Sequence, residues 1–345
     1  MRKLIALLLV LLLSAPFLTT AQESHGLVKW MSLEEALTKS KTQPKPIIID
    51  FYTDWCGWCK TMVKTTYSDP NIAEYINVFF YPVQFDAEGK DSINYLGKIY
   101  KPTSTAPRTP HPFAIEMLKG KLMYPTTIFL NGFDNEKNDY QLNLIAPGYL
   151  DAKKIQPILV YAVENVFRNC SPDDFDKYFN LAFYDSLTIV NAGKLKWLDP
   201  LEALDKQDTI NKSGKKTLVF FDADWCNSCK VMKRAVFADS LVKSKLERNF
   251  NIVEFNPDYP ATIKFRGQDF IRPQDGTFVV HQLALAMMKN NFALPTITIM
   301  DEKWQMVDAI PNFISPAFMA DILDYYGQDI YKKKSWIDFQ KAKQQ

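Results

Sequence analysis

The chain has 345 residues, of which 47% are hydrophobic and 14% aromatic, enough apolar material for the cores of two ordinary domains. Its 41 basic and 39 acidic residues leave a formal net charge of +2. This near balance excludes a strongly basic surface for nucleic acid, and the composition indicates a globular protein.

The first predicted element is a secretory signal peptide over residues 1–21. Arg2 and Lys3 precede an apolar run at residues 4–13, and the small residue Ala21 marks the expected cleavage point. This run is much shorter than the roughly 20 apolar residues that span a bilayer, although a retained anchor is the alternative. The sequence therefore predicts an exported, periplasmic or extracellular protein without a stable membrane span after cleavage.

Behind this leader, the chain contains two copies of one unit. Cys-x-x-Cys motifs begin at Cys56 and Cys226, and the same offset aligns "YPTTIFL" with "LPTITIM". Because the same offset of 170 residues holds for several motifs, and solenoid repeats are much shorter, the sequence indicates two whole domains rather than a solenoid. We expect the first domain at residues 28–180, a linker at 181–194 and the second domain at 195–345. Each ends in an extra helical tail, because "ILVYAVENVFRNCSPDDF" aligns with "ILDYYGQDIYKKKSWIDF".

Apolar periodicity predicts the same succession of elements within each copy: helix, buried strand, helix, strand, helix, strand and closing helix. The strands are expected in "PIIIDFY", "VFFYPVQFD" and "YPTTIFL" of the first copy, and in "KTLVFFD", "FNIVEFN" and "LPTITIM" of the second. Helices are expected at "LEEALTKSK", at the first cysteine of each motif, and in the segments that run into "MLKGK" and "AMMKNN". This alternation implies an α/β fold with a central mixed sheet flanked by helices.

The motifs favour thiol–disulfide exchange. A Cys-x-x-Cys pair at a helix start offers one thiol whose thiolate the helix dipole favours, and a second thiol that resolves the mixed disulfide. Cys56 and Cys226 are the expected nucleophiles, and Cys59 and Cys229 are the expected resolving thiols. Zinc is the alternative for paired cysteines, but these pairs lie in different domains, far beyond zinc-ribbon spacing. We therefore expect two local disulfides, and neither a metal nor a cofactor.

The stretch "DFYTDWCGWCK" with Asp50, the stretch "YPTTIFL" and Gly148 together resemble the thioredoxin-like superfamily. The resemblance covers nearly the whole mature chain twice, and the tandem layout is similar to that of secreted thioredoxin-related proteins. It implies a cis peptide bond before Pro125 and Pro295, where substrate backbone would pair. It also implies that Asp50 is a buried acid that accepts and returns the proton of Cys59.

The two copies differ at positions that matter for this chemistry. Phe220 replaces the buried acid in the second copy, and Asn312 replaces the late glycine. Neither motif has the proline usual between the cysteines of thioredoxin. We expect the first domain to be the faster catalyst, with Asp222 as the acid that would recover part of the role of Asp50 in the second.

Seven residues are expected to bind substrate: Trp55, Trp58, Tyr124, Pro125, Trp225, Leu294 and Pro295. For the tryptophan before each motif, a place in the core is the equal alternative. The insertion at residues 88–113 is expected to line a groove beside Cys56. His111 and His281 are expected at helix starts or in packing, rather than as titrating groups. Cys170 aligns with Lys334, which favours an exposed position. We expect an idle surface or partly covered thiol there, and a thiol that couples to a partner chain is the alternative.

The sequence favours an exported thiol–disulfide oxidoreductase that reduces or isomerises protein disulfides. Its expected partners are disulfide-containing exported proteins and a thiol–disulfide electron-exchange partner, with no nucleic acid. The alternative is a thioredoxin-fold binding or chaperone-like module for unfolded exported clients, in which the cysteine chemistry is incidental.

Overall fold

The computed structural model describes residues 26–134, 136–188, 195–205, 214–276 and 279–343. The expected signal peptide lies outside the described residues. Within those ranges, no helix is both long enough and apolar enough to cross a membrane.

A four-stranded mixed sheet forms the centre of the first half. Its strands, in spatial order, are β2 (Tyr81–Asp86), β1 (Ile47–Tyr52), β5 (Thr126–Asp134) and β6 (Asp139–Pro147). β1 pairs with β2 in parallel and with β5 antiparallel, and β5 and β6 are antiparallel. Both faces of β1 are buried, which explains why its sequence is apolar at nearly every position rather than at alternate ones.

Helices cover both faces of this sheet. They are α2 (Leu33–Thr42), α3 (Gly57–Thr65), α4 (Pro70–Phe79), α5 (Pro112–Met117), α6 (Ala152–Val163), η1 (Val166–Arg168) and α7 (Pro172–Tyr184). Ile47, Ile49 and Phe51 pack in one core with α2 and α5, whereas Ile48 packs in the other core with α4 and α6. This division follows from the alternation of side chains along a strand.

The second half repeats this architecture. Its sheet contains, in spatial order, β12 (Met306–Pro311), β11 (Thr296–Met300), β7 (Lys216–Phe221) and β8 (Phe250–Phe255), with the same parallel and antiparallel pairs. Its helices are η2 (Leu201–Asp205), α10 (Asn227–Val231), the π-helical η4 (Met232–Val236), α11 (Ser240–Asn249), α12 (Gln282–Met287), α13 (Pro316–Gly327), η5 (Ile330–Lys332) and α14 (Trp336–Lys343). The predicted fold class, with a mixed sheet, flanking helices and a C-terminal helical tail, is confirmed.

Several elements differ from the sequence expectation. The strand expected at residues 78–86 begins only at Tyr81, because Asp69 caps α4 and that helix continues to Phe79. The expectation also lacked the outer strands β6 and β12, and the small hairpins β3 (Ile93–Tyr95) with β4 (Lys98–Tyr100) and β9 (Ile263–Phe265) with β10 (Gln268–Phe270). Short, partly exposed strands give weak apolar periodicity.

The helical tails of the two halves are built alike. Asn165 and Asp329 each adopt a left-handed conformation that ends the first helix of the tail, and a short 3-10 helix follows. The Tyr161 hydroxyl donates to the carbonyl of Cys170 at 3.0 Å, as its counterpart Tyr325 does within the second tail at 2.7 Å. The tails nevertheless have different neighbours.

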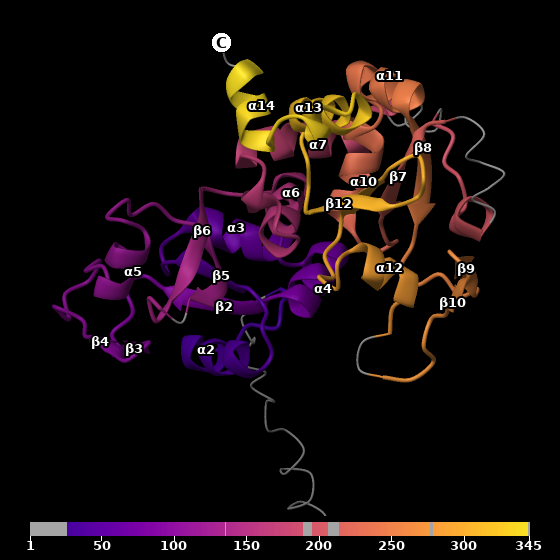
Figure 1. The fold of residues 1–345 in the computed structure, drawn as a ribbon. Coiled ribbons are helices and arrows are strands. Elements are labelled where there is room, and N and C mark those ends of the chain that lie inside the picture. Colours follow the sequence, from indigo (N-terminus) through magenta and orange to yellow (C-terminus); the bar gives the residue numbers. More distant parts are fainter. Residues whose placement is uncertain (1–25, 135, 189–194, 206–213, 277–278, 344–345) are drawn as a thin grey trace, which may run out of the picture.

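The first tail packs against the second half of the molecule. Figure 1 shows α6 and α7 between the two sheets, next to α10. Phe175 of α7 lies edge-on to Phe313 with ring centroids 5.2 Å apart, and the Asn169 side-chain amide donates to the carbonyl of Pro311 at 3.4 Å. α7 therefore shares one apolar core with α10 and η4. It also extends to Tyr184, so residues 181–184 of the expected linker are helical, while residues 189–194 lie outside the described ranges.

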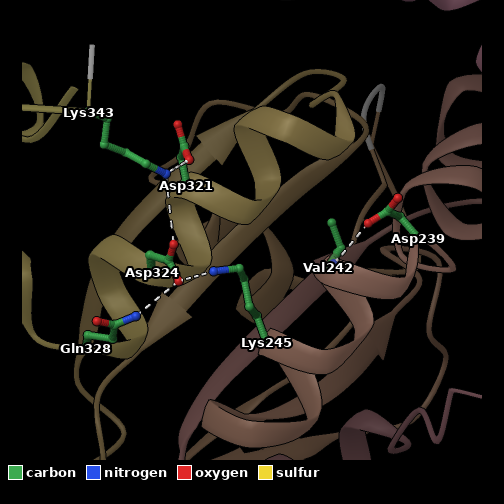
Figure 2. A network of polar contacts seen from close by, with 7 residues as sticks. All are labelled: Asp239, Val242, Lys245, Asp321, Asp324, Gln328 and Lys343. Atoms are coloured by element: carbon green, nitrogen blue, oxygen red, sulfur yellow. Dashed lines mark hydrogen bonds and ion pairs between the residues drawn. The ribbon is translucent and has the colours of Figure 1, made fainter. Parts of the chain in front are cut away.

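The second tail packs on its own half, through aromatic contacts among Tyr325, Trp336 and Phe339 and through charged side chains. Figure 2 shows Lys245 of α11 paired with Asp324 of α13, and Lys343 of α14 paired with Asp321. Gln328 at the end of α13 donates to Asp324 at 3.1 Å. These contacts keep the second tail on its own half.

We expect Phe175→Ala to lower the free energy of unfolding by roughly 3 to 5 kcal/mol, because the ring is fully buried where the two halves meet. The matched control is Phe339→Ala at the repeat counterpart, whose ring contacts Tyr325 and Trp336 of its own tail and is more accessible. Denaturant unfolding of both variants measures the difference. Equal losses would contradict a special role for the first tail.

Candidate active sites

Both cysteine pairs lie at the N-terminus of a helix that follows the first strand of a sheet. Cys56 is the N-cap of α3, and its Sγ accepts the backbone N–H of Cys59 at 3.1 Å. Cys226 caps α10 in the same way, with Cys229 as the donor at 3.2 Å. Each pair forms a disulfide, so the two predicted local pairings are confirmed.

The residues that precede β5 and β11 face these motifs in the same way. The peptide bonds Tyr124–Pro125 and Leu294–Pro295 are cis. The Pro125 carbonyl accepts the N–H of Gly148 at 2.8 Å, and the Pro295 carbonyl accepts that of Asn312 at 2.8 Å. Gly148 has a φ of +88° and Asn312 a φ of +72°. Asparagine tolerates this left-handed conformation better than most residues, so the replacement of glycine preserves the loop.

Asp50 lies in a buried polar cluster beneath the first motif. Its Oδ1 accepts the Thr127 hydroxyl at 3.3 Å, and Thr127 is its register partner on β5. Burial raises the pKa of Asp50 to about 7, although hydrogen bonds from Tyr67, Thr127 and Gln84 lower it in part. The raised pKa matches the sequence prediction, while a role in proton transfer to Cys59 stays a prediction.

The second half replaces three members of this cluster with apolar side chains, while Glu254 takes the place of Gln84. Phe220 takes the position of Asp50 and pairs in register with Ile297, where the first half has Thr127. Phe237, the counterpart of Tyr67, packs edge-on to Phe220 at 4.9 Å. The loss of the acid is therefore one of three concerted substitutions.

Asp222 lies in a different polar group of the second half. Burial raises its pKa, and the nearby charge of Glu254 raises it further. Glu254 in turn is paired with Lys233 of η4. The second half thus retains a partly buried acid, but its partners come from β8 and η4 rather than from β11.

Aromatic side chains surround Cys56 at the surface. Trp55 is 54% exposed, so the surface interpretation is correct and the core alternative is wrong for this residue. Its indole N–H donates to both carboxylate oxygens of Glu88 at 3.1 Å, and the guanidinium of Arg108 lies 5.5 Å from its ring. Glu88 and Arg108 belong to the insertion at 88–113, so that segment does lie beside the first motif. Trp58 is 63% exposed.

The remaining predicted substrate residues lie around Cys226. Trp225 is 51% exposed and is also a surface residue. Together with Leu294, Phe292 and Val280, it lines a cavity of about 170 Å³. Pro295 directly precedes β11. The expected residues of each motif are thus gathered around it, and their part in substrate binding stays a prediction.

Glu164, which the sequence reasoning missed, contacts the second motif from the first tail. Its carboxylate accepts the backbone N–H of Asn227 at 3.1 Å and that of Ser228 at 2.6 Å. The alignment of the two motif helices contained a signal that the second helix is covered by another part of the chain. Exposed Trp58 aligns with fully buried Ser228, and a threonine at 61 aligns with Val231, so the outer face of the second helix is smaller and more apolar.

The histidines serve as helix caps. Nδ1 of His111 accepts the N–H of Phe113 at 3.1 Å, and Nδ1 of His281 accepts that of Leu283 at 3.2 Å. Burial lowers the pKa of both rings, so the expected helix-start role is confirmed. Cys170 is partly covered rather than exposed, as one form of the expected idle thiol. This free thiol is half-buried against the shared core, and burial raises its pKa to about 12, which makes it unreactive.

Asp50 makes stability fall as pH rises. Its carboxyl keeps a proton in the folded protein up to about pH 7, whereas the unfolded chain loses that proton near its ordinary pKa of 3.8. The folded state therefore binds more protons between these values, and rising pH favours unfolding. Relative to Asp50→Asn, the wild type should lose up to about 4 kcal/mol of unfolding free energy between pH 4 and pH 8.

Denaturant unfolding at several pH values measures this loss. Asp54→Asn removes an exposed acid of the loop that follows β1 and controls for the change in net charge. A difference between wild type and Asp50→Asn that stays constant with pH would contradict the buried-acid assignment.

Two protein families match separate parts of the chain. Residues 11–137 match the family Thioredox_DsbH, described as "Protein of unknown function, DUF255". Residues 205–327 match the family described as "Thioredoxin-like domain". Each matched range contains one Cys-x-x-Cys motif.

Curated relatives match shorter segments. The "Thiol:disulfide interchange protein DsbD" of Photorhabdus laumondii subsp. laumondii is 34% identical over 82 residues, which cover 20% of this chain and 14% of the relative. The protein of the same name from Vibrio vulnificus is 40% identical over 47 residues, 14% of this chain and 8% of the relative. The chain therefore matches only a small part of the length of these relatives.

Among solved structures, a thioredoxin-fold protein from Helicobacter pylori aligns with a TM-score of 0.30 and 18% identity, over 41% of this chain and 88% of that one. A thioredoxin from Thermus thermophilus aligns with a TM-score of 0.29 and 14% identity, over 38% and 84% of the two chains. The two family matches, the repeated strand order and the two disulfide-linked Cys-x-x-Cys pairs place this chain in the thioredoxin-like superfamily, with two domains of that fold in tandem.

Proposed function

We propose that the protein is an exported thiol–disulfide oxidoreductase that reduces or isomerises disulfides of other exported proteins. The observation that carries this proposal is the first motif. A disulfide caps a helix N-terminus, Asp50 is buried on the strand that leads to it and has a pKa of about 7, and exposed aromatic side chains flank it. These are the parts that an exchange reaction needs.

In the reducing direction, the Cys56 thiolate attacks one sulfur of a client disulfide. One client sulfur leaves as a thiolate, and a mixed disulfide forms between Cys56 and the client. Cys59 then attacks Cys56, which releases the second client thiolate and leaves the Cys56–Cys59 disulfide. Asp50 accepts the proton that Cys59 loses, because its pKa near 7 lets it take up and return a proton at neutral pH. An electron-exchange partner must then reduce Cys56–Cys59 again by two electrons.

A protein client would bind the exposed apolar residues next to Cys56. Trp58 lies over Tyr149 with ring centroids 5.4 Å apart, and Met123 is 55% exposed directly before Tyr124. The Tyr124 hydroxyl is buried and has no hydrogen-bond partner within the described structure. A client carbonyl that accepted this hydroxyl would supply the missing partner.

The names of the curated relatives support a role in disulfide interchange. Export is supported by the apolar leader sequence and would bring the motifs into an oxidising compartment, where client disulfides form. We therefore place the protein in the periplasm or outside the cell.

We expect the first motif to carry most of the activity. A Cys226→Ser/Cys229→Ser protein should reduce a disulfide-containing client protein at nearly the wild-type rate, and a Cys56→Ser/Cys59→Ser protein should be at least tenfold slower. Asp50→Asn should slow the reaction by roughly 10²-fold or more, because positioned proton transfer contributes 10²- to 10⁴-fold. Client reduction with a dithiol as electron source measures these rates.

Equal rates from the two single-motif proteins, together with no effect of Asp50→Asn, would contradict the asymmetry. If removal of all four cysteines left client processing unchanged, the protein would instead act as a binding or chaperone-like module. Suppression of client aggregation by this cysteine-free protein is the measurement that identifies that function.

We expect Trp58→Ala to raise KM for a protein client by about fivefold or more while leaving kcat nearly unchanged, because the exposed ring offers contact area to the client. Reduction of Cys56–Cys59 by dithiothreitol should stay at the wild-type rate. Leu241→Ala, which removes an exposed apolar side chain of α11, is the control. An unchanged KM would show that clients do not contact this ring.

A further inference from the structure

The N-terminal N–H groups of the two motif helices have different surroundings. In the first half, Gly57 and Trp58 are exposed to solvent. In the second half, Asn227 is partly buried and Ser228 fully buried, since α6 and α7 pack over α10. The cover over the second motif comes from the tail of the first domain.

Glu164, directly after α6, places its carboxylate at this helix start. Its Oε1 accepts from the Asn227 N–H at 3.1 Å and from the Tyr75 hydroxyl at 3.2 Å. Its Oε2 accepts from the Ser228 N–H at 2.6 Å and lies 3.7 Å from Cys226 Sγ. With the Ser228 side chain, four donors converge on the two oxygens, which is the arrangement expected for an ionised carboxylate, an acceptor at both positions.

This carboxylate competes with a thiolate at Cys226 in two ways. It takes the two N–H groups that would otherwise help to stabilise a thiolate at a helix N-terminus. Its negative charge also lies close to the sulfur, in a partly buried setting where like charges repel strongly. A thiol at Cys226, by contrast, can donate its proton to Oε2 across the same distance.

The other titratable groups in this contact do not change that balance. Tyr75 of α4 stays neutral, because burial raises its pKa further above the ordinary value. Cys229 is the buried partner of the disulfide within α10. Burial also raises the pKa of Glu164, so the carboxylate and a Cys226 thiolate compete for a single proton.

We propose that Glu164 is a positioning residue of the second motif that holds reduced Cys226 as a thiol, which makes Cys226–Cys229 the more reducing of the two disulfides. The inference rests on the proposed function and deepens it, because it gives the two motifs different redox roles. A disulfide whose reduced form is poorly stabilised has a lower potential, and its dithiol is the stronger electron donor.

Glutathione equilibria test the proposal on the full chain. Two glutathione molecules reduce one motif: its S–S bond breaks, two S–H bonds form, and the two electrons come from the formation of oxidised glutathione. After acid quenching and alkylation, mass mapping reports each motif separately. In the wild type, the second motif should have the smaller equilibrium constant for reduction, by at least tenfold, which corresponds to about 30 mV.

Glu164→Gln should raise the equilibrium constant of the second motif by at least tenfold and leave that of the first unchanged. The matched control is Gln328→Glu, which introduces a carboxylate at the repeat counterpart, where the side chain contacts Asp324 instead of a cysteine pair. That variant should leave both constants at the wild-type value. In a Cys229→Ser background, Glu164→Gln should also move the alkylation profile of Cys226 to lower pH by about one unit.

If Glu164 had only a structural role, Glu164→Gln would change stability and leave both the potential of the second motif and the alkylation profile of Cys226 unchanged. An unchanged potential or an unchanged alkylation profile would overturn the proposal. If Glu164→Gln prevented folding, a comparison with Glu164 intact would still test the proposal. Cys226 in the Cys229→Ser protein must then ionise at higher pH than Cys56 in the Cys59→Ser protein. A lower or equal value would overturn it. If neither motif exchanged with glutathione, the proposed function itself would be wrong. If both exchanged and Glu164→Gln had no effect, only the inference would be wrong.

Discussion

The packing of α7 against α10 and η4 is the contact on which the difference between the two cysteine pairs depends. It buries Ser228, brings the end of α6 beside Cys226, and has no equivalent on the exposed N-terminal turn of α3. The apolar core that α7 shares with α10 and η4 fixes the position of the first tail. This core therefore also holds the carboxylate of Glu164 beside Cys226. Exposed ion pairs alone contribute too little to impose such an orientation. Two motifs of the same local geometry are therefore exposed to different electrostatic environments.

The interior of each domain shows a second, independent divergence. The first half keeps Asp50 with Thr127 and Tyr67, and the second half has Phe220 with Ile297 and Phe237 at the same places. Loss of the acid alone would leave a buried hydroxyl without its acceptor, which is costly, and the accompanying change of Thr127 and Tyr67 to apolar counterparts removes that cost. At this position the first domain keeps a buried acid, and the second domain has apolar packing.

Much of this architecture could be predicted from the sequence, because local patterns determine it. The buried strands, the helix starts at Cys56 and Cys226 and the duplicated tail follow from apolar runs and aligned motifs. The capping role of His111 was also accessible, since it precedes a proline at a helix start. Contacts between the repeats were not accessible in this way. Glu164 aligns with Gln328 in an ordinary helix end, and nothing in its own surroundings along the chain indicates that it contacts Cys226.

Because of the first tail, the sequence repeat and the packed domain do not have the same boundary. α7 belongs to the first repeat by descent and to the core of the second domain by contact. Suppose that a gene rearrangement exchanged the second module at the boundary between the two sequence repeats. The outer face of α10 would then lose its contact with α7, and its apolar side chains would be exposed to water. Recombination that preserves both cores must instead carry the segment from Ser171 onward with the second module.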